Sequence, residues 1–518
     1  MNPSFHLTLL TMIPLLGGAI VMGLDPRHPR LARRVGLSVS LLALVLAALV
    51  VAGFDRTEGG LQFVQRHAWV PALGIEYFVG VDGISLPLVI LTTLLVPFAL
   101  LVSSGIEHRV PLFVGLVLWL EAGLLGTFTA LNFFHWFLFW ELSLVPAFFL
   151  VRLWGGADRG PAATQFFVYT MVGSVAMLLS FLALFLATGK FNFPELAELG
   201  AQNRLPAFFN VSLGWYSLSS EALALLVFGG VFLGLAVKVP VFPFHTWLPA
   251  TYAEAPTGVT MLLTGAMSKM GVYGFLRILV PIFPEQLRSV LTPLLWLALA
   301  TIVMSAAAAL AQRDLKRLFA YSSINHLGYC LLGIFAALKF TGLDPRLAAE
   351  KAAALNGVVL QMVNHGLTAA TLFAFVGFLE QRHGGRRGLE DFGGLRRVAP
   401  VFCGLMGIAV FASLGLPGLN GFVGEFLIFK GAFTLVPWAT ALATLGLLLT
   451  AVFLLTFLQR VFHGPLNPAW THFPDLTRTE RWLVAVPTAL MFLLGIWPQP
   501  LIALINATVR QMVERLNL

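Results

Sequence analysis

Residues 225–249 read LLVFGGVFLGLAVKVPVFPFHTWLP. This stretch is apolar enough to cross a membrane as a helix, yet it contains Lys238 and is interrupted by Pro240 and Pro243. A proline inside a helix removes a backbone hydrogen bond and kinks or breaks the helix. A lysine deep in an apolar span costs several kcal/mol and therefore indicates function. We predict a broken membrane helix that carries a functional lysine.

The whole chain has the composition of an integral membrane protein. Of its 518 residues, 58% are hydrophobic and 11% are charged, with a mean hydropathy of +0.87, whereas about a quarter of residues are charged in a soluble domain. Roughly fourteen apolar runs are long enough to span a bilayer. The predicted spans are residues 6–24, 35–53, 85–103, 111–131, 132–152, 162–187, 222–243, 256–280, 289–310, 315–338, 352–379, 400–432, 437–459 and 482–503.

The cysteines and the charge exclude several functional classes. Cys330 and Cys403 are the only cysteines, and both lie in apolar runs, so this chain alone has neither a disulfide framework nor a cysteine metal cluster. No nucleotide-binding loop, dinucleotide fingerprint or haem-attachment motif is present, and we expect no redox cofactor and no metal. The net charge of +8 comes from arginines between spans, which is typical of an orientation signal and not of nucleic-acid binding.

The arginines of alternate loops predict the orientation of the chain. Because basic loops face the cytoplasm, both termini and the long loops 54–84 and 188–221 are expected on the periplasmic side. The segment GIEYFVGVDG within 54–84 predicts a β-hairpin on that face. The basic residues that define the cytoplasmic loops are Arg27, Arg30, Arg33, Arg34, Arg152, Arg159, Arg313, Lys316, Arg317, Arg382, Arg386, Arg387, Arg396 and Arg397.

A second interrupted span, FASLGLPGLNGFVGEFLIF at residues 411–429, matches the first. Paired interruptions at corresponding places in two halves indicate a transporter built from inverted repeats. Spans four to eight and nine to thirteen would form the two five-helix units, with Lys238 and Glu425 at equivalent positions. The predicted division is an N-terminal region 1–110, a first unit 111–281, a second unit 282–460, and a C-terminal loop, helix and tail 461–518.

Ionisable residues inside the first unit are the first candidates for a site. Glu141 has about nine apolar or weakly polar residues on either side, too deep to reach water, and Lys238 is the obvious type of partner. Gly234, one turn before Lys238, would leave room for the lysine side chain. Glu121 could be a neighbour of Glu141, although helix packing through a protonated carboxyl explains it nearly as well.

Further ionisable candidates lie between Lys238 and the second interrupted span. Lys269 shares one helix face with Gly265 and Tyr273. His326 and His365 lie in polar stripes, which are either interhelical hydrogen-bond glue or proton relays; the two explanations are equal at His326, and the relay is favoured at His365. Together, Glu141, Lys238, Lys269, His326, His365 and Glu425 would form a line of acids, bases and relays at the bilayer midplane.

Three long strings resemble a known family. HTWLPATYAEAPTGVTMLLTGAMSKMGVYGFLRI (245–278), RDLKRLFAYSSINHLGY (313–329) and LEDFGGLRR (389–397) are similar to the antiporter-like proton-channel subunits of respiratory complex I, of multisubunit cation/proton antiporters and of membrane hydrogenases. The resemblance covers spans three to thirteen. Glu425 in GFVGEFLIFKG resembles the M type of subunit, the counterpart of mitochondrial subunit four, because the sister subunits carry lysine there.

The resemblance implies a fold of fourteen helices with two inverted five-helix units and a proton-translocating role in NADH:quinone oxidoreductase of a bacterial cytoplasmic membrane. Quinone reduction would occur in other subunits, and two sister subunits would be its partners. By similarity, Glu141 and Lys238 would control the proton affinity of Lys269. His326 and His365 would connect Lys269 to Glu425, the terminal acid.

The sequence departs from the family pattern at one position, and three alternative functions remain open. The family usually has aspartate after HTWLP, where this chain has Ala250, so cytoplasmic proton uptake would use Glu254 or His245 instead. The alternatives are a Na⁺/H⁺ antiporter subunit, a membrane hydrogenase subunit, and a structural spacer whose buried charges are inert ion pairs.

Overall fold

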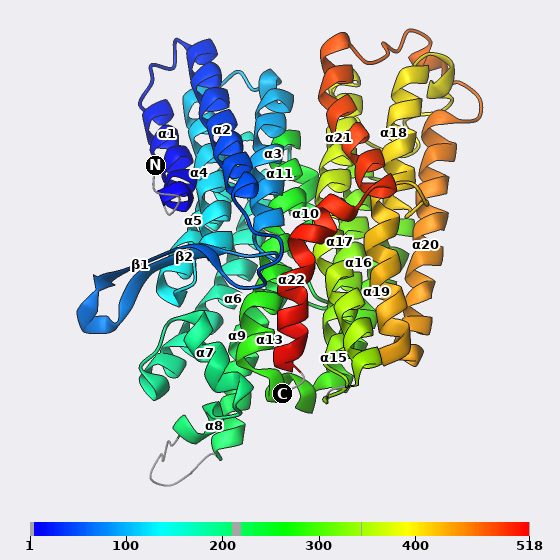
Figure 1. The fold of residues 1–518 in the computed structure, drawn as a ribbon. Coiled ribbons are helices and arrows are strands. Elements are labelled where there is room, and N and C mark those ends of the chain that lie inside the picture. Colours follow the sequence, from blue (N-terminus) through cyan, green and yellow to red (C-terminus); the bar gives the residue numbers. More distant parts are fainter. Residues whose placement is uncertain (1–4, 210–218, 343, 517–518) are drawn as a thin grey trace.

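The computed structural model describes residues 5–209, 219–342 and 344–516. Helices run side by side through most of the molecule, with the N-terminal helices at one side and α18, α20 and α21 at the other (Figure 1). Within the described residues, eleven helices are long and apolar enough to cross a membrane. Three predicted spans remain: 6–24 corresponds to the short helix α1, 256–280 to the interrupted run from α11 to α13, and 400–432 to α18 together with α19. The predicted all-helical membrane fold is confirmed.

The elements follow the chain in the order of the predicted spans. The N-terminal region contains α1 (His6–Met22), α2 (Pro29–Ala52), β1 (Gln62–Val70), β2 (Ile75–Val81) and α3 (Leu86–Val102). Next come α4 (Val110–Thr129), α5 (Phe133–Trp154), α6 (Arg159–Thr188), α7 (Phe193–Ala201), α8 (Leu205–Phe208), α9 (Ser220–Lys238) and α10 (Trp247–Glu254). A continuous run follows, made of α11 (Thr257–Leu262), η4 (Leu263–Met267), α12 (Lys269–Gly274), η5 (Phe275–Leu279) and α13 (Val280–Ile282).

The second half of the chain continues in the same way. It contains α14 (Pro284–Ser289), α15 (Leu291–Leu310), α16 (Leu315–Ala337), α17 (Pro345–Arg382), α18 (Pro400–Ser413), α19 (Asn420–Leu435) and α20 (Pro437–Phe462). The chain ends with α21 (Arg478–Ile496) and the amphipathic α22 (Gln499–Leu516). The predicted last span, 482–503, was wrong at its end, because the helix stops at Ile496 and Trp497 and Pro498 separate it from α22.

The β-hairpin between α2 and α3 is confirmed. Strands β1 and β2 pair antiparallel, and Gly74 between them has a left-handed backbone with φ of +63°. Arg66 of β1 contacts both Glu76 of β2 and Glu195 of α7, each at 2.7 Å. Burial acts to raise the pKa of Glu195, but hydrogen bonds from Asn192, Lys190 and Arg66 outweigh it and hold the pKa below its ordinary value. The hairpin is therefore tied by charge to α7.

Both broken helices are present where the prolines and glycines predict them. Helix α9 ends at Lys238, and the released backbone groups find new partners: Phe242 N donates to Thr301 Oγ1 and Trp247 Nε1 donates to Val237 O, both at 3.0 Å. Such re-satisfaction is what permits irregular backbone at membrane depth. The second break, between α18 and α19, contains Gly415 with φ of +75°.

Close helix packing requires glycine at several contacts. A Cβ added to Gly234 would lie 2.7 Å from the Cβ of Met177 and 2.8 Å from Gly173 O. Gly234 therefore allows α9 to pack on α6, and its suggested role of leaving room for Lys238 stays a prediction. At the contact between α17 and α19, a Cβ on Gly357 would lie 2.6 Å from Ile428 N and 2.9 Å from Gly424 O.

The contact at Gly357 gives a test of this packing. We expect Gly357→Ala to destabilise the protein by about 1–3 kcal/mol, because a clash with backbone atoms forces the two helices apart. Gly404→Ala in α18 is the matched control, since nothing lies within 4 Å of a Cβ at Gly404. Thermal unfolding in detergent measures the difference, and equal midpoints for the two variants would contradict the packing argument.

Candidate functional site

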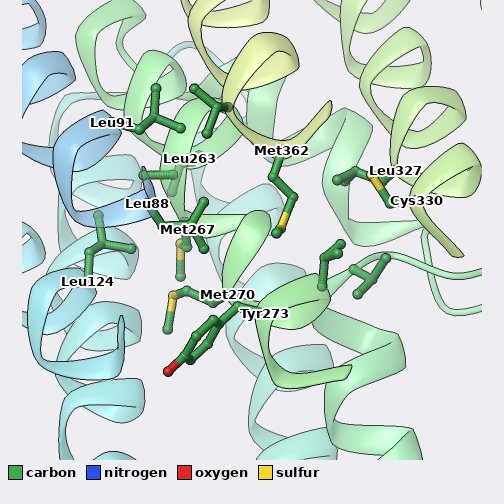
Figure 2. Packing of buried hydrophobic residues seen from close by; sticks show 14 of the residues in the cluster. Leu88, Leu91, Leu124, Leu263, Met267, Met270, Tyr273, Leu327, Cys330 and Met362 are labelled. Atoms are coloured by element: carbon green, nitrogen blue, oxygen red, sulfur yellow. The ribbon is translucent and has the colours of Figure 1, made fainter. Parts of the chain in front are cut away.

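The site is organised around Lys269, which is fully buried at the middle of the run from α11 to α13. Two π-helical segments, 263–267 and 275–279, flank it, and single π-turns inside helices are frequent at functional sites. Apolar side chains surround this part of the helix, among them Leu124, Leu263, Met267 and Met270 (Figure 2). The lysine therefore lies in an apolar environment with few polar neighbours.

Three polar groups surround the amine of Lys269. Its Nζ donates to Thr264 O at 2.5 Å and lies 3.4 Å from Ser268 Oγ. The third neighbour is His365 Nδ1 on α17, at 2.8 Å. Because an ammonium group has no acceptor, Nδ1 of His365 must be unprotonated when Lys269 is charged. This contact joins the two units directly.

The remaining predicted residues of the second unit continue from His365. The imidazole rings of His365 and His326 have centroids 5.1 Å apart. His326 Nδ1 then lies 2.9 Å from Glu425 Oε1. The structure thus brings Lys269, His365, His326 and Glu425 together as one contiguous line across α12, α17, α16 and α19.

Polar side chains around this line fix its members. Gln361 Nε2 donates to Glu425 Oε1 at 3.2 Å, and His326 Nε2 lies 3.2 Å from Ser413 Oγ. A Cβ on Gly415 would lie 2.7 Å from Glu425 Oε2, so the glycine of the break leaves space for the carboxylate. Gln361 Oε1 is buried with no hydrogen-bond partner within the described part of the chain.

A pair of asparagines holds the start of α19 against α17. Asn364 Nδ2 donates to Asn420 O at 2.7 Å, and Asn420 Nδ2 donates to Asn364 O at 3.1 Å. Asn420 also contacts Thr368 Oγ1 at 3.2 Å. Sequence analysis identified the α17 stripe but not Asn420, whose partners are 56 and 52 residues away.

Glu141 and Lys238 do not form the direct ion pair that the sequence suggested. Lys238 Nζ and Glu141 Oε1 are buried without a hydrogen-bond partner among the described residues. Lys238 Nζ instead lies 5.0 Å from the ring centroid of Trp140, whose Nε1 donates to Ser174 Oγ at 3.0 Å. An aromatic ring can stabilise a cation at this distance. The two charges are neighbours with space between them.

Glu121, like Glu141 and Lys238, lies outside the line formed by Lys269, His365, His326 and Glu425. Its side chain is fully buried on α4, and neither carboxylate oxygen has a hydrogen-bond partner within the described ranges. Its suggested pairing with Glu141 is not seen. An acid in such surroundings needs a proton or water.

A cluster of charges at the arginine-rich end was missed by sequence analysis, which treated Arg387 and Lys316 only as orientation signals. Arg387 contacts Glu254 at 2.7 Å and Asp314 at 2.5 Å, and Lys316 contacts Glu380 at 2.7 Å. Burial acts to lower the pKa of Arg387, but the neighbouring Asp314, Glu254 and Glu380 hold it above its ordinary value. The guanidinium is therefore permanently charged.

This cluster lines a cavity of about 400 Å³, to which Glu254, Lys316, Glu380 and Arg387 all contribute. Glu254 was one of the two residues suggested to replace the missing aspartate. His245, the other, does not line this cavity and stacks on Phe242 with centroids 5.4 Å apart.

Comparison with known proteins identifies similar chains. The family described as NADH:quinone oxidoreductase/Mrp antiporter, TM matches residues 130–450. The chain is 36% identical over 513 residues to NADH-quinone oxidoreductase subunit M of Rhodobacter capsulatus, covering 98% of this chain and 96% of the relative. A chain of respiratory complex I from Thermus thermophilus with bound NADH superposes with a TM-score of 0.84 at 28% identity, covering 98% of this chain and 99% of that chain.

A chain of the Mrp complex from a Dietzia species also superposes with a TM-score of 0.84, covering 100% of both chains at 21% identity. At that identity the likeness concerns the fold alone. The two superpositions are equally good, so the sequence identity and not the fold separates the two kinds of relative.

The asparagine pair gives a test of the site's geometry. We expect Asn420→Ala to destabilise the protein by about 1–3 kcal/mol, because the main-chain carbonyl of Asn364 and the hydroxyl of Thr368 lose the buried donor that the Asn420 side chain supplies. Thr444→Ala on an exposed part of α20 is the control, since Thr444 bonds only within its own helix. The midpoints of thermal unfolding in detergent measure the effect. Equal midpoints for the two variants would show that the pair of Asn364 and Asn420 does not hold α19.

Proposed function

The chain belongs to the NADH:quinone oxidoreductase/Mrp antiporter family of membrane proteins, and from this premise we propose that it moves protons across a membrane as a subunit of NADH:quinone oxidoreductase. One observation carries the proposal: Lys269, His365, His326 and Glu425 form a contiguous line of titratable groups inside the helical bundle. Ionisable groups cost several kcal/mol in the interior of a membrane protein and mark proton relays there.

The geometry supports a definite order of proton movements in the second unit. The Lys269 ammonium gives its proton to Nδ1 of His365, the nitrogen that it already contacts. The imidazolium of His365 then releases its other proton towards His326, by ring rotation or through one water between the rings. His326 passes a proton to Glu425 through its Nδ1. Each step leaves a histidine in the tautomer opposite to its starting one, so the rings must reset before the next proton.

Glu141 and Lys238 control this line from the first unit. Lys238 Nζ and Oε1 of Glu141 have no hydrogen-bond partner within the described chain, so the two groups can approach each other without either atom giving up a hydrogen bond. A change of charge at Lys238 alters the electrostatic energy of the Lys269 ammonium, because two like charges in a protein interior repel by kcal/mol amounts. The signal that moves Glu141 or Lys238 would come from a neighbouring subunit.

Proton uptake starts at the cavity of the arginine-rich end. Glu254 and Lys316 line it, and hydroxyl groups of Thr260, Thr264 and Ser323 continue from it towards Lys269, with Thr264 and Ser323 3.0 Å apart. Glu254 thus replaces the aspartate that this family usually has where Ala250 stands.

The position in the complex follows from the same proposal. Residues 111–281 and 282–460 act as the two half-channels, and two sister subunits of the family lie beside this chain in a bacterial cytoplasmic membrane. The arginine-rich loops face the cytoplasm, and both termini face the periplasm. NADH oxidation and quinone reduction take place in other subunits, and this chain carries no redox chemistry of its own.

The runner-up is a subunit of a Na⁺/H⁺ antiporter. Its support is the fold alone, since the Mrp relative is 21% identical, whereas the quinone oxidoreductase subunit is 36% identical. Glu425 in place of lysine also favours the quinone oxidoreductase. Co-purification in mild detergent separates the two, because the antiporter subunit would not bring NADH-oxidising subunits with it.

The central lysine provides the main test. We expect Lys269→Ala to leave the complex assembled but to abolish most proton pumping coupled to NADH oxidation, because His365 loses its proton donor. Glu141→Ala is expected to give the same loss through the control pair. Pumping is followed in inverted membrane vesicles with a pH-sensitive dye.

Lys430→Ala is the matched control, since Lys430 is an exposed lysine of α19 that pairs with Glu350 at 2.8 Å. Normal pumping by Lys269→Ala would overturn the proposed function. Unchanged coupling in a Lys269→Ala, Glu425→Ala double variant would favour the structural-spacer alternative instead.

The uptake route has a separate test. We expect Glu254→Gln to slow NADH-driven pumping severalfold while the complex stays assembled, because the amide keeps the side chain's shape but cannot take up a proton. His245→Gln serves as the comparison and is expected to pump at the normal rate. The opposite ranking of the two variants would move the uptake route to His245.

A further inference from the structure

A second polar line leaves Lys269 along its own helix. Tyr273 and Arg277 follow the lysine at intervals of four residues, which places Arg277 about 12 Å farther along the helix axis. Arg277 Nε donates to Tyr273 OH at 3.2 Å, and that hydroxyl donates to Phe128 O at 3.3 Å. Tyr273 therefore stands between the lysine and the arginine.

Arg277 is held by an acid that comes from a distant part of the chain. Its Nη2 lies 2.5 Å from Asp82 Oδ2, with 14% and 4% of the two side chains exposed. Asp82 follows β2, and its other oxygen accepts the backbone N–H groups of Ile84 and Ser85. Both members of the ion pair are thus fixed in place.

The ion pair lines a cavity. This cavity has a volume of about 180 Å³ and is lined by Asp82, Arg277, Leu61, Thr508 and Arg515. One water needs roughly 10–15 Å³ of such space, so the cavity holds several. It lies at the end of the bundle that carries α7 and α22 (Figure 1), the end assigned above to the periplasm.

The chemistry of arginine makes this position significant. A proton relay needs groups that accept a proton on one side and release one on the other, as a histidine or a lysine amine does. A guanidinium has five donors, no acceptor, and does not lose its proton in proteins. An arginine in a pore also repels protons through its charge.

We infer that Arg277, held by Asp82, is a barrier that prevents protons in the periplasmic cavity from reaching Lys269 through the first unit. The inference rests on the proposed function, in which Lys269 exchanges protons with the cytoplasmic cavity. Without the barrier, Lys269 would be open to both sides, and the gradient would dissipate through it. With the barrier, the line through His365 and His326 is the route to the periplasm.

The test measures passive proton leak in vesicles without NADH. A pH gradient is imposed across inverted membrane vesicles that contain the complete complex, and its decay is followed with a pH-sensitive dye. We expect Arg277→Gln to raise the leak about tenfold over the unmodified protein. Adding Lys269→Ala to Arg277→Gln should return the leak to the original level, because the leak passes through the lysine.

Two further variants separate a barrier from a structural tie. Arg277→Lys keeps the charge and the partner Asp82, so we expect it to fold even if Arg277→Gln does not. Vesicles with Arg277→Lys should still leak protons, because an amine can accept and release them. Arg66→Gln removes another arginine that forms ion pairs near the same end of the bundle and should not leak. The inference would be overturned if Arg277→Lys showed no increased proton leak, or if the leak persisted in the double variant of Arg277→Gln with Lys269→Ala.

Failure of the barrier and failure of the proposed function give different results. Failure of the proposed function appears as normal NADH-driven pumping by Lys269→Ala alone. If Lys269→Ala abolishes pumping but vesicles with the Arg277 variants show no increased proton leak, only the inference that Arg277 is a barrier is overturned.

Discussion

The cost of placing a charge in hydrocarbon governs how this protein is built. Lys269 is fully buried, and the polar groups that it contacts are a carbonyl, a hydroxyl and an imidazole. Its proton is therefore held by neighbours that can let it go, and not by a carboxylate that would trap it. Glu425 has the complementary arrangement, with an imidazole and an amide on one oxygen. The helices are arranged so that these few contacts can form.

Broken helices are the means by which such contacts form at membrane depth. An intact helix uses its backbone groups internally, whereas a break turns both helix ends into polar surfaces inside the bundle. At the second break, a Cβ on Gly421 would lie 1.9 Å from Ala412 O, so the two halves approach each other more closely than any side chain would allow. The carboxylate of Glu425 occupies the space beside Gly415. Gly415 thus leaves the space that the carboxylate of Glu425 occupies at the end of the line.

Sequence reasoning identified the residues of the line but could not identify all of their contacts. A lysine or histidine in an apolar run stands out without a structure, because its cost is local, and prolines and glycines mark the breaks for the same reason. Contacts between distant segments carry no local signal: Arg277 meets Asp82 across 195 positions, and Arg387 meets Glu254 across 133. The π-turns beside Lys269 and the separation of Glu141 from Lys238 depend on how whole helices pack. Arg387 could have been suspected from Asp314 and Glu254 in the neighbouring loops, but an arginine-rich loop has a simpler explanation.

The two proposed units differ in how their buried titratable groups are held. In the second unit, His326 and His365 lie between Lys269 and Glu425 at distances that suit transfer. In the proposed first unit, Glu141 and Lys238 form no direct ion pair within the described chain, and Glu141 Oε1 and Lys238 Nζ are buried without a hydrogen-bond partner there. Unit charges about 7 Å apart interact by about 2 kcal/mol at an effective dielectric constant of about 20, enough to change a protonation equilibrium more than tenfold. A pair without a direct contact can shift in response to such a change of charge. The difference supports the proposal that Lys238, in the first interrupted span, controls the proton of Lys269 and does not carry it.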